Sequence, residues 1–545
     1  MRDPAGLSGS EKADIVNLRR HRTALPVLIG LASACLAGCD AGLVGRSGAG
    51  SDGQVVVGMS DSVLATDPAS GYDPGSWLVF NNVFQSLLSF PNGATEPVPE
   101  AAEACSFTDR QVTTYRCTLK DGLKFSTGEP LTSADVKFTF DRIRRIDDPA
   151  GPAVMFQNLK SVQTPDDETV VFRLRLPDAT FPSKIASGAG SLVSRAHYDA
   201  NGLRRDGKAV GSGPYELDSF TKDEAVFSVN EKYQGTAEVR NKGVRLKFFQ
   251  ADQKALKEAL VEGQVDLAYR GLSARDLADL EKGSGGSAPD VVEGTGVEVQ
   301  HLVFNMKDPV AGRRGVRRAV AHLLDRDALV KEVHRDTAIP LYSIIPSGIA
   351  GHNTAFFDTY GAAPSRTAAA AALRADGITD KVKLTLWSTP ARYGPATDQT
   401  LKDIAGQLNS SGLFEADVKS VPFEQYEKGI QAGTYGVYVK GWVPDYPDAD
   451  NFTAPFFGEG NVLGNHYRNA TITGTLIPRT AAERDRAATN DEFDRLQNIV
   501  AEELPLLPVW QSKQYVAVRD DIRGYQYCLD ASTVFRFWEL YRSTT

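Results

Sequence analysis

Residues 441–452 (GWVPDYPDADNF) hold the densest group of side chains that could contact a ligand. The segment combines aromatic rings, two prolines and three carboxylates, and its prolines exclude a regular helix. We interpret it as one wall of a binding cleft, in which rigid aromatic faces line the cleft and one carboxylate meets a cation. A plain turn and a calcium site are the alternatives, although the calcium pattern D-x-[DN]-x-[DN]-G is missing.

The motifs of catalysis and of metal binding are missing from the sequence. Residues 202–208 have the spacing of a phosphate loop, but Ala209 stands where that loop needs a hydroxyl group. The seven histidines show no H-E-x-x-H or other metal spacing, and neither C-x-x-C nor G-x-S-x-G occurs. We therefore expect a binding protein, not an enzyme, with no metal and no cofactor.

An apolar run that ends in Leu36-Ala37-Gly38-Cys39 predicts a lipoprotein signal. Residues 23–38 carry no charge, and the run is shorter than the roughly 20 residues that span a membrane. Cleavage before Cys39 would leave this residue to carry the acyl chains, of which stable anchoring needs at least two. An ordinary signal peptide is the alternative, and the pair Arg19-Arg20 does not decide between the general and the twin-arginine export route.

Three cysteines remain after the leader and the lipidated residue are set aside. Cys105 and Cys117 flank an expected hairpin, so an exported protein should join them in a disulfide. Two unpaired buried thiols are the alternative. Cys528 is left over, and we expect it to be a small buried hydrophobic residue.

Length and charge set the class of protein. Removal of 38 of the 545 residues leaves 507, which is enough for two or three domains. The leader carries a net charge of +2, so the mature chain has a net charge of about −11, which argues against nucleic acid as a partner. Residues 39–53, rich in Gly, Ser and Ala, suit a flexible tether.

Helices and strands are expected to alternate along the folded part of the chain. Alternating apolar residues predict strands at 115–119 and 170–176, and a helix from 133 to 145 opens on the capping-box sequence Thr132-Ser-Ala-Asp135. Apolar residues at helical spacing predict further helices near 254–261 and 316–324. The fold class is therefore mixed α/β.

Five segments resemble the family 5 extracellular solute-binding proteins, the peptide and oligopeptide receptors of ABC importers. They follow the order of the family across almost the whole mature chain. The segments are DGLKFSTGEPLTSADVKFTFDRI (121–143), GSGPYEL (211–217), FNMKDP with RRGVRRAVAHLLDRDALV (304–330), GWVPDYPDADNF (441–452) and LPLLPVWQSKQYVAVRDDIRGY (504–525).

The resemblance implies a two-lobe, periplasmic-binding-protein-like fold, with ligand enclosed between lobes that two crossovers join. We expect the crossovers near Gln300 and Leu506. The expected organisation is a leader (1–38), a tether (39–53), lobe I (54–299, with an extra subdomain at about 74–200), lobe II (300–505) and a C-terminal return to lobe I (506–545).

The resemblance also implies roles for individual residues. Asp445 occupies the position that pairs with the α-ammonium of a peptide, and Arg392 lies in a segment that supplies an arginine to the ligand carboxylate. A solvated loop arginine is the alternative for Arg392. Tyr72 and Asn305 occupy positions near the cleft of the family.

The resemblance implies a function as well. It describes a monomeric, lipid-anchored receptor on the extracellular face of the cytoplasmic membrane, which delivers short peptides to a permease driven by an ATPase. An oligosaccharide or another small solute, stacked on Trp387, Trp442 and Tyr446, is the alternative ligand.

Overall fold

A computed structural model describes residues 53–250, 252–283, 289–390, 392–394 and 396–543. These residues belong to one compact unit of the chain, Ser47–Thr545. The predicted leader, Cys39 and all of the predicted tether except Gly53 lie outside the described residues. Within the described residues, no helix has both the length and the apolar character needed to cross a membrane.

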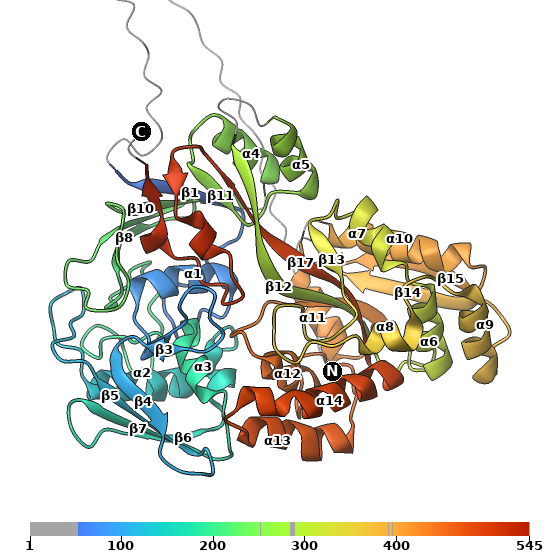
Figure 1. Cartoon of the computed structure of the whole chain (residues 1–545), viewed down its shortest axis with the longest axis horizontal. Coiled ribbons are helices and arrows are strands. Elements are labelled where there is room, and N and C mark those ends of the chain that lie inside the picture. Colours follow the sequence, from blue (N-terminus) through green and yellow to red (C-terminus); the bar gives the residue numbers. More distant parts are fainter. Residues whose placement is uncertain (1–52, 251, 284–288, 391, 395, 544–545) are drawn as a thin grey trace, which may run out of the picture. The chain divides into compact units, whose positions relative to one another are not determined.

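A mixed sheet of eleven strands runs through the described part of the chain (Figure 1). Its order is β15-β14-β16-β12-β17-β11-β1-β10-β9-β8, and β13 pairs with β17 outside this path. The strands are β1 (Val55–Met59), β8 (Tyr215–Phe220), β9 (Glu224–Val229), β10 (Val244–Phe248), β11 (Leu267–Tyr269), β12 (Asp290–Phe304), β13 (Ala338–Pro340), β14 (Val382–Ser388), β15 (Phe414–Ser420), β16 (Val437–Trp442) and β17 (Leu506–Val518). Parallel and antiparallel pairs both occur, and helices alternate with the strands, so the predicted mixed α/β class is confirmed.

Three buried clusters of apolar side chains account for most of the core. We call core A the cluster around β1 and β8 to β11 and core B the cluster around a separate four-stranded sheet. Core C takes its buried members from residues 297–510. A smaller cluster covers the other face of β1 and β11 against α4 (Gln253–Val261) and α5 (Ala274–Lys282).

The two long strands β12 and β17 connect core A with core C. They pair antiparallel from Asp290↔Val518 to Val303↔Leu506 and lie side by side in Figure 1. Val299 and residues 506, 507, 509 and 510 pack in core C, whereas Val516 and Val518 pack in core A. On β12 the packing in core C begins at Val297, and on β17 it passes from core C to core A between Trp510 and Val516. The crossovers near Gln300 and Leu506 stay a prediction, as do the lobe limits.

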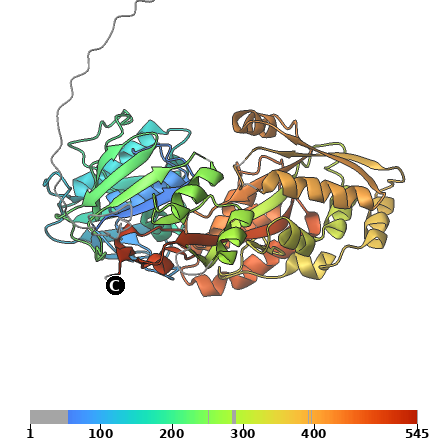
Figure 2. The ribbon, with the colours of Figure 1, turned by 90° about the horizontal axis from the view of Figure 1, so that it is seen from above.

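Helices cover core C on both sides of its strands. In α6 (Arg314–Leu323) the residues Val316, Ala319, Val320 and Leu323 are buried, as the helical spacing predicted. The orange helix α10 (Thr397–Ser410) runs beside β14 and β15 in Figure 2. The other helices of this region are α7 (Arg326–Glu332), α8 (Ala355–Tyr360), α9 (Arg366–Ala375), α11 (Phe423–Gln431), α12 (Ala454–Phe457), α13 (Ile477–Ala482) and α14 (Asn490–Glu503).

Core B fills the space between a four-stranded antiparallel sheet and two helices. The sheet has the order β4 (Ala102–Phe107), β5 (Thr114–Leu119), β7 (Thr169–Leu174), β6 (Leu159–Gln163), and the helices are α2 (Ser133–Ile146) and α3 (Phe181–Ala186). The predicted capping box is confirmed, since Thr132 and Asp135 form both of its contacts. Arg142 of α2 and Asp67 form a buried ion pair at 2.6 Å.

Short elements complete the described chain. They are α1 (Pro74–Val83), β2 (Leu88–Ser89), β3 (Val98–Pro99), β18 (Ile522–Arg523), β19 (Tyr541–Arg542) and short 3₁₀ or π turns at 152–156, 188–190, 449–452, 472–476, 486–489, 525–528 and 537–539. The α1 helix begins after Asp73, whose side chain accepts the Ser76 N–H at 2.9 Å. This cap fixes the loop that carries Tyr72.

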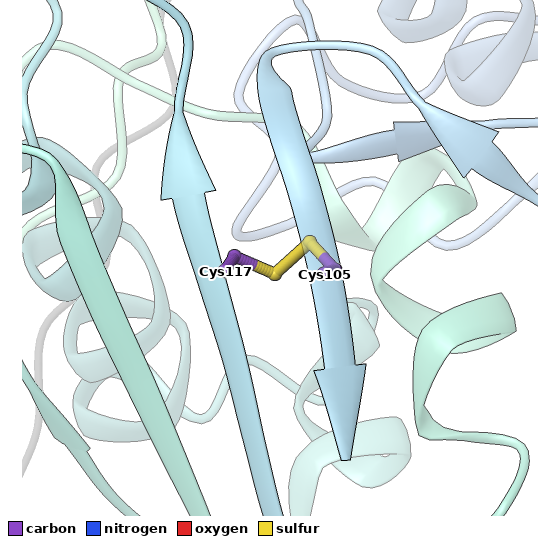
Figure 3. Close-up of a disulfide and its surroundings, with 2 residues drawn as sticks. All are labelled: Cys105 and Cys117. Atoms are coloured by element: carbon purple, nitrogen blue, oxygen red, sulfur yellow. A yellow bond between two sulfur atoms is a disulfide. The ribbon is translucent and has the colours of Figure 1, made fainter. Parts of the chain in front are cut away.

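The cysteines lie in core B and core A. Cys105 on β4 and Cys117 on β5 are paired residues of the hairpin, and a disulfide joins them (Figure 3). Cys528 is a free, buried thiol that packs in core A, as the sequence predicted.

Candidate ligand-binding site

A cavity of about 330 Å³ lies where β12 and β17 pass from one core to the next. Its volume falls in the lower part of the range for small-molecule sites. The cavity is lined by residues after the carboxyl ends of β1 and β11, by residues 296–298 of β12 and by residues 510 and 512–515 of β17. Core C adds Val443, which follows β16, and residues 392–394 with the start of α10. Strands β1 and β11 are parallel neighbours, so their carboxyl ends open at the same edge, where open α/β sheets bind ligands.

An acid–arginine–acid group forms part of the cavity lining. The Nε–H of Arg270 donates to Asp61 Oδ2 at 2.6 Å, and its Nη2 lies 3.7 Å from Glu298 Oε2. A register irregularity in β12 between Gly294 and Glu298 precedes the glutamate, and such bulges re-aim side chains. We call these three residues the cavity trio.

The sequence analysis missed the cavity trio. Asp61 and Arg270 each follow a short buried strand, which is the one local signal that could have drawn attention to them. Arg270 also has a positive φ of 54°, which is uncommon for a residue with a side chain, and this strain cannot be read from residue type.

Arg392 lines the same cavity, as its predicted role requires. Its side chain is exposed, and its guanidinium lies 4.9 Å from the centre of the Phe423 ring. Burial raises the pKa of Glu298, and the charges of Arg270 and Arg392 oppose that rise. Burial also raises the pKa of Asp73, which Arg392 opposes through its charge. Arg392 therefore lies near enough to Glu298 and Asp73 for its charge to act on both carboxyl groups.

The Asp445 carboxylate lies beside the cavity and not in its lining, since Val443 lines the cavity two residues earlier. Its Oδ2 accepts hydrogen bonds from Tyr72 Oη and from Asn451 Nδ2, both at 3.0 Å. Burial raises the pKa of Asp445 to about 6, although both hydrogen bonds and the charge of Lys184 lower it. Among the described residues no hydrogen bond reaches Oδ1, so this oxygen is the available acceptor.

Asn451 organises this segment, and the sequence analysis did not single it out. Its Oδ1 accepts the backbone N–H of Asp445 and the indole Nε1–H of Trp442, both at 2.9 Å. The Trp442 ring packs edge-on against Phe456 at 5.4 Å. The buried side-chain amide of Asn451 therefore fixes the positions of Trp442 and Asp445, two of the predicted ligand contacts.

Tyr446 does not form the exposed aromatic surface that the sequence predicted. Its side chain is 3% exposed and packs in core B, where all other buried members come from residues 69–192. Its hydroxyl lies 3.4 Å from Thr180 Oγ1. In a segment without regular periodicity, residue type alone cannot say which side a ring faces, and here the free energy of burial turned it inward.

The remaining predicted residues divide into one that joins the site and two that do not. Tyr72 donates to Asp445, and its ring lies 5.6 Å from that of Trp77. Asn305 is buried in the turn after β12, where its Oδ1 accepts the Lys307 N–H, and its Nδ2 donates to Gly433 O from a distant part of the chain. Trp387 stacks on Tyr435 at 4.2 Å, with Lys419 over the ring. Neither Asn305 nor Trp387 lines the cavity.

The possible metal ligands of the described part of the chain are its His, Cys, Asp and Glu side chains. No group of three or more His, Cys, Asp or Glu side chains in that part of the chain is arranged to hold a metal ion. Two of the three aspartates of residues 441–452 illustrate this. Asp445 is held by Tyr72 and Asn451, whereas Asp448 pairs with Arg486 at 2.8 Å.

Residues 96–464 match the family described as bacterial extracellular solute-binding proteins, family 5 Middle. The chain belongs to this family. The match covers more than half of the 545 residues and contains Asp445, Arg392 and the four-stranded sheet. The family relationship confirms the resemblance inferred from the five segments.

Individual relatives agree with this assignment. The dipeptide-binding protein of Escherichia coli (strain K12) is 24% identical over 482 residues, which are 83% of this chain and 87% of that protein. Two solved structures cover 90% of this chain. One is the ABC transporter-associated periplasmic binding protein DppA of Helicobacter pylori in complex with the peptide STSA (TM-score 0.78, 21% identity, 98% of that chain). The other is AgaA of A. tumefacien R10 in complex with agropinic acid (TM-score 0.74, 22% identity, 99% of that chain). The fold is the two-lobe fold of the periplasmic binding proteins of this family.

Proposed function

We propose that this protein is the lipid-anchored substrate-binding protein of an ABC importer, and that it captures short peptides between its lobes. The observation that carries the proposal is the Asp445 carboxylate, whose Oδ1 has no hydrogen-bond donor among the described residues. Asp445 is half-buried, and closure of the lobes over it would leave an unpaired carboxylate at a cost in free energy unless a cation meets it. The α-ammonium of a peptide supplies that cation.

Arg392 would hold the other end of the ligand. A guanidinium matches the geometry of a carboxylate with two parallel hydrogen bonds, and Arg392 lines the cavity without an ion-pair partner among the described residues. Asp445 and Arg392 therefore offer one anion and one cation to a zwitterion. A peptide with both termini free has this pattern of charge.

Closure around the ligand would use contacts that already join the cores. Tyr72 lies against core B and Asp445 follows β16 of core C, yet the two side chains are hydrogen-bonded. Ala179 N–H likewise donates to Ala481 O at 2.7 Å. We propose that lobe I comprises residues 54–299 and 506–545, that lobe II comprises 300–505, and that β12 and β17 act as the hinge.

A second candidate keeps the fold and changes the ligand to an oligosaccharide or another small solute. The relative AgaA, whose structure contains agropinic acid, shows that the fold accommodates ligands other than peptides. Trp442 remains partly exposed and could stack on a sugar ring, but Tyr446 and Trp387 are engaged elsewhere. A neutral sugar also leaves the Asp445 charge unpaired.

Calorimetry with two peptides tests the proposal. The parent protein and Asp445→Asn are titrated with one peptide whose N-terminus is free and with the same peptide acetylated. The substitution should weaken binding of the free peptide by about 2 to 5 kcal/mol and should change binding of the acetylated peptide much less. Asp403→Asn on α10, which does not line the cavity, is the matched control. Equal losses for both peptides would show that Asp445 does not bind the amine.

The proposal also includes a lipid anchor outside the cell and a transporter in the membrane. Cys39 would carry the lipid, and the receptor would deliver its ligand to a permease with a cytoplasmic ATPase. The family description as extracellular solute-binding proteins and the description of the Helicobacter pylori relative as ABC transporter-associated support this assignment.

A further inference from the structure

The cavity trio carries one more negative than positive charge. Asp61 and Glu298 share the single guanidinium of Arg270, which lies 2.6 Å from the aspartate and 3.7 Å from the glutamate. All three side chains line the cavity and retain between about one quarter and one third of their exposure, 33% for Asp61, 28% for Arg270 and 23% for Glu298.

Two carboxylate oxygens of the cavity trio accept no hydrogen bond from the described residues. Arg270 donates to Asp61 Oδ2, and Gln300 Nε2 donates to Glu298 Oε1 at 3.0 Å. Within the described residues, no hydrogen bond reaches Asp61 Oδ1 or Glu298 Oε2. Asp61 Oδ1, in the loop after β1, and Glu298 Oε2, on β12 and 3.7 Å from Arg270 Nη2, can therefore each still accept a hydrogen bond at the wall of one cavity.

The other charged groups of the lining do not cancel this excess. Lys513 pairs with Glu293 at 3.0 Å, and burial lowers the pKa of His334 to about 4, so its imidazole is neutral near pH 7. Arg392 is the remaining cation, and the proposed function uses it for the ligand carboxylate. With Asp445 on the ligand ammonium, both termini are matched and the negative charge of the trio is left over.

We propose that the cavity selects peptides with a cationic side chain, Lys or Arg, whose head group is accepted by Asp61 and Glu298 beside Arg270. The inference rests on the proposed function and names the substrate class of the same site. An acidic side chain would instead face two carboxylates that already share one guanidinium. A neutral side chain would displace water from Asp61 Oδ1 and Glu298 Oε2 without supplying a hydrogen-bond donor, which is unfavourable.

Titration calorimetry with matched peptides tests the inference. The peptides are Lys-Ala-Ala, Ala-Lys-Ala and Ala-Ala-Lys, each compared with the peptide in which norleucine, a similar chain without the ammonium group, replaces lysine. The parent should bind at least one lysine peptide ten or more times more tightly than its norleucine partner. Glu298→Gln and Asp61→Asn should each reduce that ratio to threefold or less and leave norleucine binding nearly unchanged.

Glu415→Gln is the matched control, because Glu415 on β15 also faces a cation, Lys383 at 3.7 Å, but neither residue lines the cavity. Its lysine preference should equal that of the parent. A parent that binds every norleucine peptide as tightly as its lysine partner overturns the inference and leaves the proposed function intact. Equal losses for both peptides in Glu298→Gln also overturn it, because they indicate a structural role. No binding of any of the six peptides overturns the proposed function together with the inference.

Discussion

Tyr72 donates its phenolic O–H to Asp445 Oδ2 over 3.0 Å, although 373 positions separate the two residues in the chain. The tyrosine precedes α1 and packs against core B, and the aspartate follows β16 of core C. The hydrogen bond holds one carboxylate oxygen and leaves the other available. It also makes the two parts of the proposed cleft depend on each other.

The pH dependence of peptide affinity should follow Asp445. Its pKa in the free protein is about 6, and a bound ammonium would lower that pKa, because the ion pair favours the charged carboxylate. Peptide affinity is therefore highest well above pH 6, where Asp445 is charged, and it falls as the pH drops through 6 and Asp445 is protonated. Linkage predicts binding about tenfold weaker at pH 5 than at pH 7. Calorimetry at both values measures this ratio, and a flat profile would contradict the assignment.

Asp445→Asn supplies the control for that profile, because its side chain does not titrate. The variant should show little change in affinity between pH 5 and pH 7. A slope that persists in the variant would point to Asp450, whose pKa burial also raises to about 6. The comparison therefore separates the two neighbouring carboxyl groups.

Tyr72→Phe should weaken peptide binding without unfolding the protein. The substitution removes a hydrogen bond to a charged acceptor, worth about 1.5 to 3 kcal/mol, and so raises the pKa of Asp445 further. We expect at least a tenfold loss of affinity at pH 7 and a higher midpoint in the pH profile. Tyr215→Phe removes a hydrogen bond to Asn241 within core A and should lower stability while leaving affinity unchanged. Identical pH midpoints for Tyr72→Phe and the parent would count against the proposed role of this contact.

Arg392→Gln should abolish discrimination between peptides with free and amidated C-termini. The parent should prefer the free carboxylate by about tenfold, as expected for a charge-assisted pair of hydrogen bonds. The variant should bind both forms alike. Arg366→Gln, at the start of α9 and outside the cavity lining, should retain the preference of the parent. A preserved preference in Arg392→Gln would favour the solvated loop arginine.

The disulfide should be detectable in exported protein and should contribute to stability. Peptide mapping without reductant is expected to recover Cys105 and Cys117 joined, and both should resist thiol labelling. Replacing both cysteines by serine should lower the free energy of unfolding by about 3 kcal/mol, given their sequence separation of 12. Cys528 is buried and its pKa is raised to about 12, so it should be labelled only after denaturation. Labelling of Cys105 in the native exported protein would refute the pairing.

Cys39→Ser tests the anchor. The variant should leave the membrane fraction, because no acyl chain can be attached at residue 39. Cys35→Ser, four positions earlier in the leader, is the control and should remain anchored. Retention of Cys39→Ser in membranes after a high-salt wash would show that another element holds the protein there.

Local patterns were sufficient for the individual elements and for the family. The helix from Ser133 was readable because a capping box needs only residues three positions apart, and α6 because 3.6-residue periodicity marks its buried face. The hairpin of β4 and β5 was readable because its turn is short. The segment around Asp445 was recognisable because its composition is unusual for regular structure.

The tertiary structure decided which of these side chains meet. Asp61 and Arg270 follow β1 and β11, and Glu298 lies on β12. They converge because β1 pairs parallel with β11 and β17 joins β11 to β12, an order that no local period encodes. Tyr446 turned into core B and Asp445 toward Tyr72 for a similar reason. The side-chain directions of an irregular segment are set by the surfaces that close over it, and those surfaces come from residues more than 250 positions away.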